Sequence, residues 1–274
     1  MRFGICAGPN SFPPNPGETP AAATKRLLAF VRDAGADYIE FTVGAVAPEG
    51  SPAEFEQLQA ALSGAALRAE AFNSFIPGHH PITGPAVNLA ALLKYCEVAL
   101  QRCKAVGAEV VVLGSGRARR IPDGFERATA EAQFVKFCRE LDPIAEAIGI
   151  DIAIEPLNTK EDNLITTVSD GAKLVDTIAR KRIQLLADLY HMSEDKEPVS
   201  NVAAAGSRLI HTHLADLGRV APGYAQGEED FLGFFKNLKK AKYDKRCSFE
   251  GKFDSVEKQT KPLLDLMKRR WAEA

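Results

Sequence analysis

Short apolar runs alternate with longer amphipathic stretches along the chain. The apolar runs have the length of buried strands, and the amphipathic stretches have the helical spacing of about 3.6 residues. The pattern predicts strands over residues 2–8, 38–43, 67–73, 109–113, 150–155, 183–188, 208–214 and 246–251. It predicts helices over residues 20–34, 53–63, 89–106, 125–147, 169–179, 198–205, 230–241 and 256–270, with Ser169 as a candidate N-cap.

Eight strand–helix units follow one another without a composition break or an obvious linker. A chain of 274 residues with eight such units has the size of a (β/α)₈ TIM barrel, so we expect a single barrel domain over residues 1–274. The structural alternative is an open, doubly wound sheet. Polar residues end adjacent and non-adjacent strands alike, and only a closed ring brings all of those ends together. The pattern therefore favours the barrel.

Ligand-type side chains stand at the carboxyl ends of the last four predicted strands. These residues are Glu155, Asp188, His213 and Glu250. In a (β/α)₈ barrel such ends surround one pocket, where the active sites of this fold lie. His211 precedes His213 by two positions and faces the same side of its strand. We interpret it as a core or supporting histidine below the pocket.

Three carboxylates in one pocket repel one another. At about 4 Å and an effective dielectric constant of about 20, each pair costs about 4 kcal/mol. A divalent cation removes this cost, and three carboxylates with one imidazole suit Mn²⁺, Mg²⁺ or Co²⁺ better than a structural zinc ion. The sequence therefore predicts a metal site, with Mn²⁺ as the expected ion and Mg²⁺, Co²⁺ or Zn²⁺ as alternatives.

Composition narrows the class of protein. The chain is 46% hydrophobic and 26% charged with a net charge of −2, which is typical of a globular protein without general affinity for nucleic acid. Its first residues read as a strand and not as a signal peptide, and no apolar run reaches the length of a membrane span. The five cysteines form no CxxC pair, which fits reduced thiols. We expect a cytoplasmic protein whose partner is a small molecule, with neither nucleic acid nor membrane.

Four motifs, one on each of the last four strands, resemble those of a known family. They are Glu-Pro-Leu-Asn at 155–158, Asp-Leu-Tyr-His at 188–191, His-Thr-His at 211–213 with Arg219 six residues on, and Ser-Phe-Glu at 248–250. The first strand and residues 72–77 are also similar. The chain thereby resembles the sugar isomerases and epimerases of the xylose isomerase-like TIM barrels, which include ketose 3-epimerases and hydroxypyruvate isomerase.

The resemblance implies a metal-dependent isomerase or epimerase of a keto-sugar or sugar phosphate. Glu155, Asp188, His213 and Glu250 would be the metal ligands. Glu155 and Glu250 would also exchange protons with opposite faces of the substrate carbon, through a metal-stabilised enediolate. The resemblance further implies a homodimer or homotetramer.

The same resemblance assigns His191, Arg219 and Glu161 to substrate oxygens, with His191 expected to end the sixth strand. Each also has a plain structural interpretation, as a loop histidine, an arginine paired with a neighbouring carboxylate and a residue of a solvated loop. Two departures from the family pattern leave the exact substrate open. Thr159 stands where epimerases often have arginine, and Gly251 where they often have proline.

Three other functions fit the same scaffold. A lyase or dehydratase of the inosose or dehydroshikimate type would use the same metal and base. A DNA-repair nuclease of the AP-endonuclease type needs further histidines on strands three and four, but strand four is followed by Gly114. A non-catalytic sugar-binding barrel is the third alternative, and the retention of all four expected ligands argues against it.

Several polar residues have two interpretations. Glu40, near the end of the second strand, either contacts substrate or only lines the barrel. Arg117, Arg119 and Arg120 bind a substrate phosphate or carry surface charge. His79 and His80 belong either to a lid or to a hydrated surface loop.

Overall fold

Eight parallel strands close into a barrel in chain order, which confirms the predicted (β/α)₈ fold over the open sheet. The computed structural model describes residues 1–12, 14–65 and 67–274. Each strand pairs with the next, and β8 returns to β1 with Arg246 opposite Arg2. The strands are β1 (Arg2–Cys6), β2 (Tyr38–Thr42), β3 (Ala69–Asn73), β4 (Val110–Leu113), β5 (Asp151–Ile154), β6 (Ile183–Asp188), β7 (Leu209–Leu214) and β8 (Arg246–Phe249).

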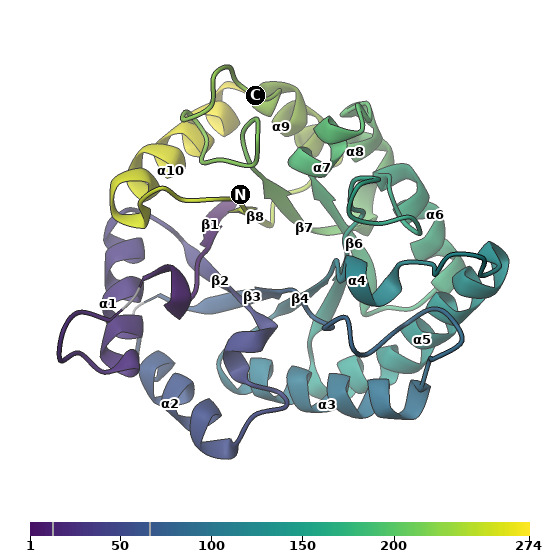
Figure 1. Ribbon diagram of the computed structural model, residues 1–274. Helices are drawn as coiled ribbons and strands as arrows, with labels where there is room; N and C mark the ends of the chain where they lie inside the picture. The colour runs from purple at the N-terminus through teal and green to yellow at the C-terminus, as the bar shows by residue number, and fades with distance from the viewer. Residues whose placement is uncertain (13, 66) are drawn as a thin grey trace.

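Helices surround the ring of strands (Figure 1). They are α1 (Pro20–Asp33), α2 (Pro52–Leu62), α3 (Leu89–Ala105), α4 (Gly116–Arg119), α5 (Arg127–Ile148), α6 (Val168–Ile178), α7 (Leu189–Glu194), α8 (Ser200–Ala205), α9 (Phe231–Lys240) and α10 (Val256–Glu273), with 3₁₀ turns η1 (Pro9–Ser11), η2 (Val43–Val46) and η3 (Gly206–Arg208). The sequence pattern does not predict α4 and α7, because each is too short to repeat the helical spacing. Over the part of the chain that the structure describes, no helix has the length and apolar character needed to cross a bilayer.

Side-chain caps show where two helices begin and correct two predictions. The Asp188 carboxylate accepts a hydrogen bond of 2.9 Å from the Tyr190 N–H and caps α7. β6 therefore ends at Asp188, and His191 lies on α7 and not at a strand end as predicted. The cap of α6 is Thr167 and not Ser169, because the Thr167 hydroxyl accepts a hydrogen bond from an N–H of the first turn.

The alternation of side chains along the strands decides which residues reach the carboxyl rim of the barrel. Side chains two positions apart face the same side of a strand. Glu155 lies two positions after Ala153, and Asp188 lies two positions after Leu186. The apolar layer inside the barrel is therefore followed by a layer of ionisable groups at the rim. The apolar layer consists of Tyr38, Ala71, Val110, Val112, Ala153, Leu186 and Ile210.

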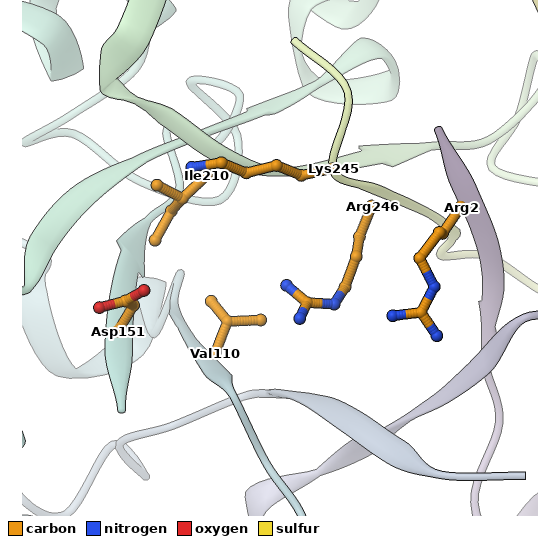
Figure 2. Close-up of a pocket in the computed structure, with 6 residues that line it drawn as sticks. All are labelled: Arg2, Val110, Asp151, Ile210, Lys245 and Arg246. Carbon is orange, nitrogen blue, oxygen red and sulfur yellow. The ribbon is translucent and has the colours of Figure 1, made fainter. Parts of the chain in front are cut away.

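Charged side chains close the opposite, amino-terminal end of the barrel. Arg2 of β1 and Arg246 of β8 lie side by side at a cavity of about 290 Å³ (Figure 2). Glu70 is the residue of β3 at which the register with β2 shifts, and it is 1% exposed. Its carboxylate accepts hydrogen bonds from Arg2 Nη1 at 2.5 Å and Arg246 Nε at 3.0 Å. This end of the barrel is therefore held by ion pairs with a structural role.

We expect Glu70→Gln to lower the free energy of unfolding by about 2 kcal/mol, because it leaves two partly buried guanidinium groups without their shared carboxylate. Urea unfolding at pH 7 measures the effect. An unchanged unfolding free energy would mean that solvent already screens these pairs.

The same carboxylate predicts a pH dependence of stability. Burial alone would raise the pKa of Glu70, but the hydrogen bonds from Arg2 and Arg246 lower it below its ordinary value of 4.5. The native state therefore binds this proton more weakly than the unfolded state. The stabilisation is complete above pH 4.5 and is lost as the pH falls through the lower native pKa. Unfolding curves between pH 3 and pH 7 should converge for wild type and Glu70→Gln at the acid end.

Candidate active site

Four ligand-type side chains meet above the apolar layer of the barrel. Glu155 follows β5, Asp188 ends β6, His213 lies on β7 and Glu250 follows β8. One ligand atom of each lies within 4.8 Å of the others. His213 Nδ1 is 2.9 Å from Glu155 Oε1 and 3.5 Å from Glu250 Oε2. The structure thus brings together all four residues that the sequence assigns to a metal.

Burial and mutual charge shift the pKa of all four groups. Burial, followed by the charge of Glu155, raises the pKa of Asp188 to about 8. Burial, followed by the charge of Glu250, raises the pKa of Glu155. Burial alone would also raise the pKa of Glu250, but His213 lowers it to about 2. Burial would lower the pKa of His213, but the carboxylates, Glu40 first, raise it well above its usual value. The four side chains therefore favour the binding of protons or of a cation, because added positive charge offsets the repulsion between the carboxylates.

Asp188 Oδ2 and His191 Nε2 are two of the buried atoms at this pocket that have no hydrogen-bond partner among the described residues. They are 3.6 Å apart, which is too far for a hydrogen bond. A buried carboxylate oxygen without a partner is costly, and a cation held by the four residues would satisfy it. Three carboxylates and one imidazole are also a donor set that suits Mn²⁺ and related ions. The side chains present therefore fit a divalent cation.

A buried carboxylate supports His213 from the opposite side. Glu40, on β2 and 0% exposed, accepts hydrogen bonds from His213 Nε2 at 3.0 Å, His211 Nε2 at 2.8 Å and Ser248 Oγ at 2.6 Å. The Nε2 atom of His213 is thereby directed toward Glu40, and its Nδ1 atom toward the four-residue cluster. His211 lies outside that cluster and acts as a core histidine.

The three residues assigned to substrate border the cluster. His191 Nδ1 accepts hydrogen bonds from the backbone and side-chain N–H groups of Asn158, at 3.2 and 2.9 Å, so its proton lies on Nε2. Burial, followed by the charge of Arg219, lowers the pKa of His191 to about 3 and keeps the ring neutral. Arg219 donates to Glu250 at 2.8 Å and to Glu161 at 3.3 Å.

A cleft of about 580 Å³ opens above these groups, a size within the range of small-molecule sites. Its walls come from the segments that follow β2, β3, β4, β5, β7 and β8. The lining includes the polar residues Glu155, Glu161, Arg219 and Glu250 together with Pro77, Gly78 and Arg117.

The three arginines after β4 have different surroundings. Arg119 is 0% exposed, and its guanidinium donates to the Asp162 carboxylate at 2.7 Å and to the Glu155 carbonyl at 2.7 Å. It also donates to the carbonyl of the last residue of β4 at 3.0 Å. Arg119 is therefore structural, and the interpretations of it as a phosphate ligand or a surface charge are wrong. Arg117 lines the cleft, and Arg120 is exposed.

Two asparagines for which the sequence pattern predicts no role also contact the site. Asn73 Nδ2 donates to Glu250 Oε1 at 2.9 Å, and Asn158 Nδ2 donates to Glu161 Oε1 at 3.0 Å. Asn73 ends β3, so its place at a strand end was the available signal. Its neutral amide carries no charge, so it does not stand out in the sequence as the carboxylates and the histidine at the other strand ends do.

Comparison with known proteins identifies the family to which the chain belongs. The family described as the xylose isomerase-like TIM barrel matches residues 28–270. The 3-dehydro-D-guloside 4-epimerase of Escherichia coli (strain K12) is 30% identical over 115 residues, which are 42% of this chain and 43% of the relative. The L-ribulose 3-epimerase of Methylomonas sp. (strain DH-1) is 34% identical over 121 residues, which are 43% of this chain and 41% of the relative. The chain thus spans less than half the length of the curated relatives it matches.

A solved structure resembles the chain over nearly its whole length. The apo form of 3-keto-D-glucoside 4-epimerase from E. coli superposes with a TM-score of 0.80, covering 98% of this chain and 99% of that one, at 22% identity. At this identity the likeness describes the fold alone.

Proposed function

Because the chain belongs to the xylose isomerase-like TIM barrel family, we propose that it is a divalent-metal-dependent epimerase or isomerase of keto-sugars that uses Mn²⁺. The observation that carries the proposal is the cluster of Glu155, Asp188, His213 and Glu250, whose ligand atoms lie within 4.8 Å of one another. The names of the curated relatives, a 4-epimerase of a keto-glycoside and an epimerase of a ketose, support a sugar substrate.

The four side chains would hold a cation that, when bound, stabilises the negative charge developing on the substrate carbonyl oxygen. Around it, His191 Nε2 and the Arg219 guanidinium would donate hydrogen bonds to substrate oxygens. Glu161, which Asn158 and Arg219 hold in place, would accept a hydrogen bond from a substrate hydroxyl. The cleft would bind the rest of the sugar.

Glu155 and Glu250 would transfer the proton of the carbon next to the carbonyl. They follow strands three apart in the ring, and both lie beside His213 Nδ1, so they border the same space. Asn73 and Arg219 each bind one oxygen of Glu250, at 2.9 and 2.8 Å, and fix its orientation. One carboxylate takes the proton on one face, and the other returns a proton on the opposite face, which gives epimerisation. Return to the neighbouring carbon gives aldose–ketose isomerisation.

A substrate panel in D₂O with Mn²⁺ tests the proposal. It should contain ketoses, aldoses, their phosphates and 3-keto-glycosides. We expect at least one keto-sugar to take up one solvent deuterium on the carbon next to its carbonyl while its epimer or isomer forms. Binding without deuterium uptake would instead support a sugar-binding barrel. An enone absorbance with a cyclic polyol or shikimate-type acid would support a dehydratase, and nicking of abasic DNA a nuclease.

Substitution of Glu40 should change the metal affinity, although Glu40 is not one of the four proposed ligands. A carboxylate that accepts the far N–H of a ligating histidine fixes the ring and makes it a better ligand, and its loss costs about 10–100-fold in affinity. We expect Glu40→Gln to raise the Kd for Mn²⁺ by this factor, because it removes the ionised acceptor that directs His213 Nδ1 to the cluster. Isothermal titration calorimetry on metal-free protein measures the change.

Glu70→Gln is the matched control, because it also removes a buried carboxylate of the barrel but at the opposite end. It should reduce stability without changing the Kd for Mn²⁺. Equal Mn²⁺ affinities of wild type and Glu40→Gln would contradict the assigned role of Glu40.

A further inference from the structure

Three ligating side chains converge outside the candidate active site. Glu49 lies between η2 and α2, and His79 and His80 lie between β3 and α3. His79 Nε2 is 3.0 and 3.1 Å from the two Glu49 oxygens, and His80 Nε2 is 2.9 Å from Glu49 Oε1. One ligand atom of each residue lies within 4.8 Å of the others. Two imidazoles and one carboxylate from two different loops thus direct their donor atoms to one place.

The surrounding structure holds this cluster in position while leaving it open to solvent. The His80 ring packs on the Tyr95 ring at a centroid distance of 4.8 Å, and the backbone N–H of His80 donates to the Pro77 carbonyl at 3.0 Å. Tyr95, on α3, donates its hydroxyl to the Phe75 carbonyl at 2.9 Å. The side chain of His79 is 62% exposed and that of His80 22%. An ion can therefore reach donors whose backbone and rings are already oriented.

The donor distances are close to those of a coordinated ion. Imidazole nitrogen and carboxylate oxygen bind Zn²⁺ at about 2.0–2.2 Å, so two ligands of a tetrahedral ion are about 3.4 Å apart. The observed nitrogen–oxygen separations of 2.9–3.1 Å need an outward shift of only about 0.4 Å. The set also differs in kind from the central cluster, because imidazole donors suit Zn²⁺ whereas the three carboxylates suit Mn²⁺ or Mg²⁺.

We propose that Glu49, His79 and His80 form a second metal site, which binds Zn²⁺ and ties the loop after β2 to the loop after β3. The proposal does not depend on the reaction assigned to the barrel. The site would nevertheless connect the ion to the cleft, because Pro77 and Gly78, next to His79, line the same cleft as Glu155. Gly78 also packs closely on Arg117, since a Cβ at Gly78 would lie 3.1 Å from the Arg117 Cβ. An ion at this site restrains that wall.

Zinc binding to the full chain tests the proposal. The central cluster can also take Zn²⁺, so the number of ions per chain is the primary readout, measured by chelator competition and by metal analysis after dialysis. We expect two Zn²⁺ per chain for wild type and one for His79→Gln/His80→Gln. Glu49→Gln should weaken binding at the second site at least tenfold. Glu56→Gln, on the exposed side of α2, is the matched carboxylate control and should bind two.

Anomalous scattering from zinc-soaked crystals locates the ion independently. A peak among Glu49 and the two Nε2 atoms supports the site. Two outcomes overturn the proposal: equal stoichiometry and affinity of wild type and the double histidine variant, or a second peak elsewhere in the molecule. The variants lie at the surface, and circular dichroism checks that each is folded.

Discussion

Glu155→Gln and Glu250→Gln should each reduce epimerisation by about 10³-fold or more at saturating Mn²⁺, because each removes one of the two carboxylates proposed to carry the proton. Exchange of the substrate proton with D₂O distinguishes the roles of the two carboxylates better than the rate of epimerisation does. If each carboxylate serves one face of the carbon, each single variant should still exchange the proton of one epimer with D₂O but not that of the other. The two variants should have opposite preferences, which NMR of both epimers in D₂O can measure.

The substitution keeps an oxygen donor, so the fold and much of the metal binding should survive. Thermal unfolding and the Kd for Mn²⁺ check this directly. Glu131→Gln, on the outer surface of α5, is the control and should have wild-type activity. Near-normal epimerisation by Glu155→Gln or Glu250→Gln, with metal bound, would refute the proton-transfer role of that residue.

Removal of the divalent ion should abolish turnover, and Mn²⁺ or Co²⁺ should restore it. Without a cation the pocket binds protons, since the pKa of Asp188 is about 8 and that of His213 is well above its usual value. Metal binding must displace these protons, so the Kd for Mn²⁺ should rise as the pH falls below about 8. Calorimetry in buffers of different ionisation enthalpy should detect proton release on binding.

The midpoint temperature of thermal unfolding gives a second measure of metal binding. A ligand that binds only the folded chain stabilises it, so Mn²⁺ should raise the midpoint of wild type and have a smaller effect on Asp188→Asn. Full activity of protein stripped of metal to below a few per cent occupancy would rule out the metal mechanism, whatever the pH profile.

The parts of the site that the sequence predicts are those that follow from side-chain alternation. Glu155 and Asp188 lie two positions beyond buried interior residues of β5 and β6, so their orientation toward the pocket is a property of the strand itself. The eight strand–helix units are equally local, because each depends on its own hydrophobic spacing. This is why strand order and barrel closure agree with the prediction.

The wrong predictions and the missed residues depend on side-chain contacts that the hydrophobic spacing of the sequence does not reveal. The apolar run continues past Asp188 and therefore predicts a strand end at His191, whereas the Asp188 carboxylate caps a helix at that point. The three partners of Glu40 are 171, 173 and 208 residues away along the chain, so its two interpretations cannot be separated without the closed ring. Arg119 resembles its exposed neighbours in sequence, and only the packing of the loop after β5 reveals its buried carboxylate partner.

Arg119 has a consequence for how the enzyme proposed above would admit its sugar. Its guanidinium joins the Glu155 carbonyl, the end of β4 and the Asp162 carboxylate in one buried set of bonds. Moving the backbone here would break these bonds and leave a buried guanidinium without its partners, which is costly. Glu155 can therefore adjust only through its own side-chain torsions. The backbone after β4 and β5 is thus pre-organised before a sugar binds, and any rearrangement of loops around the cleft would have to come from the other segments that line it.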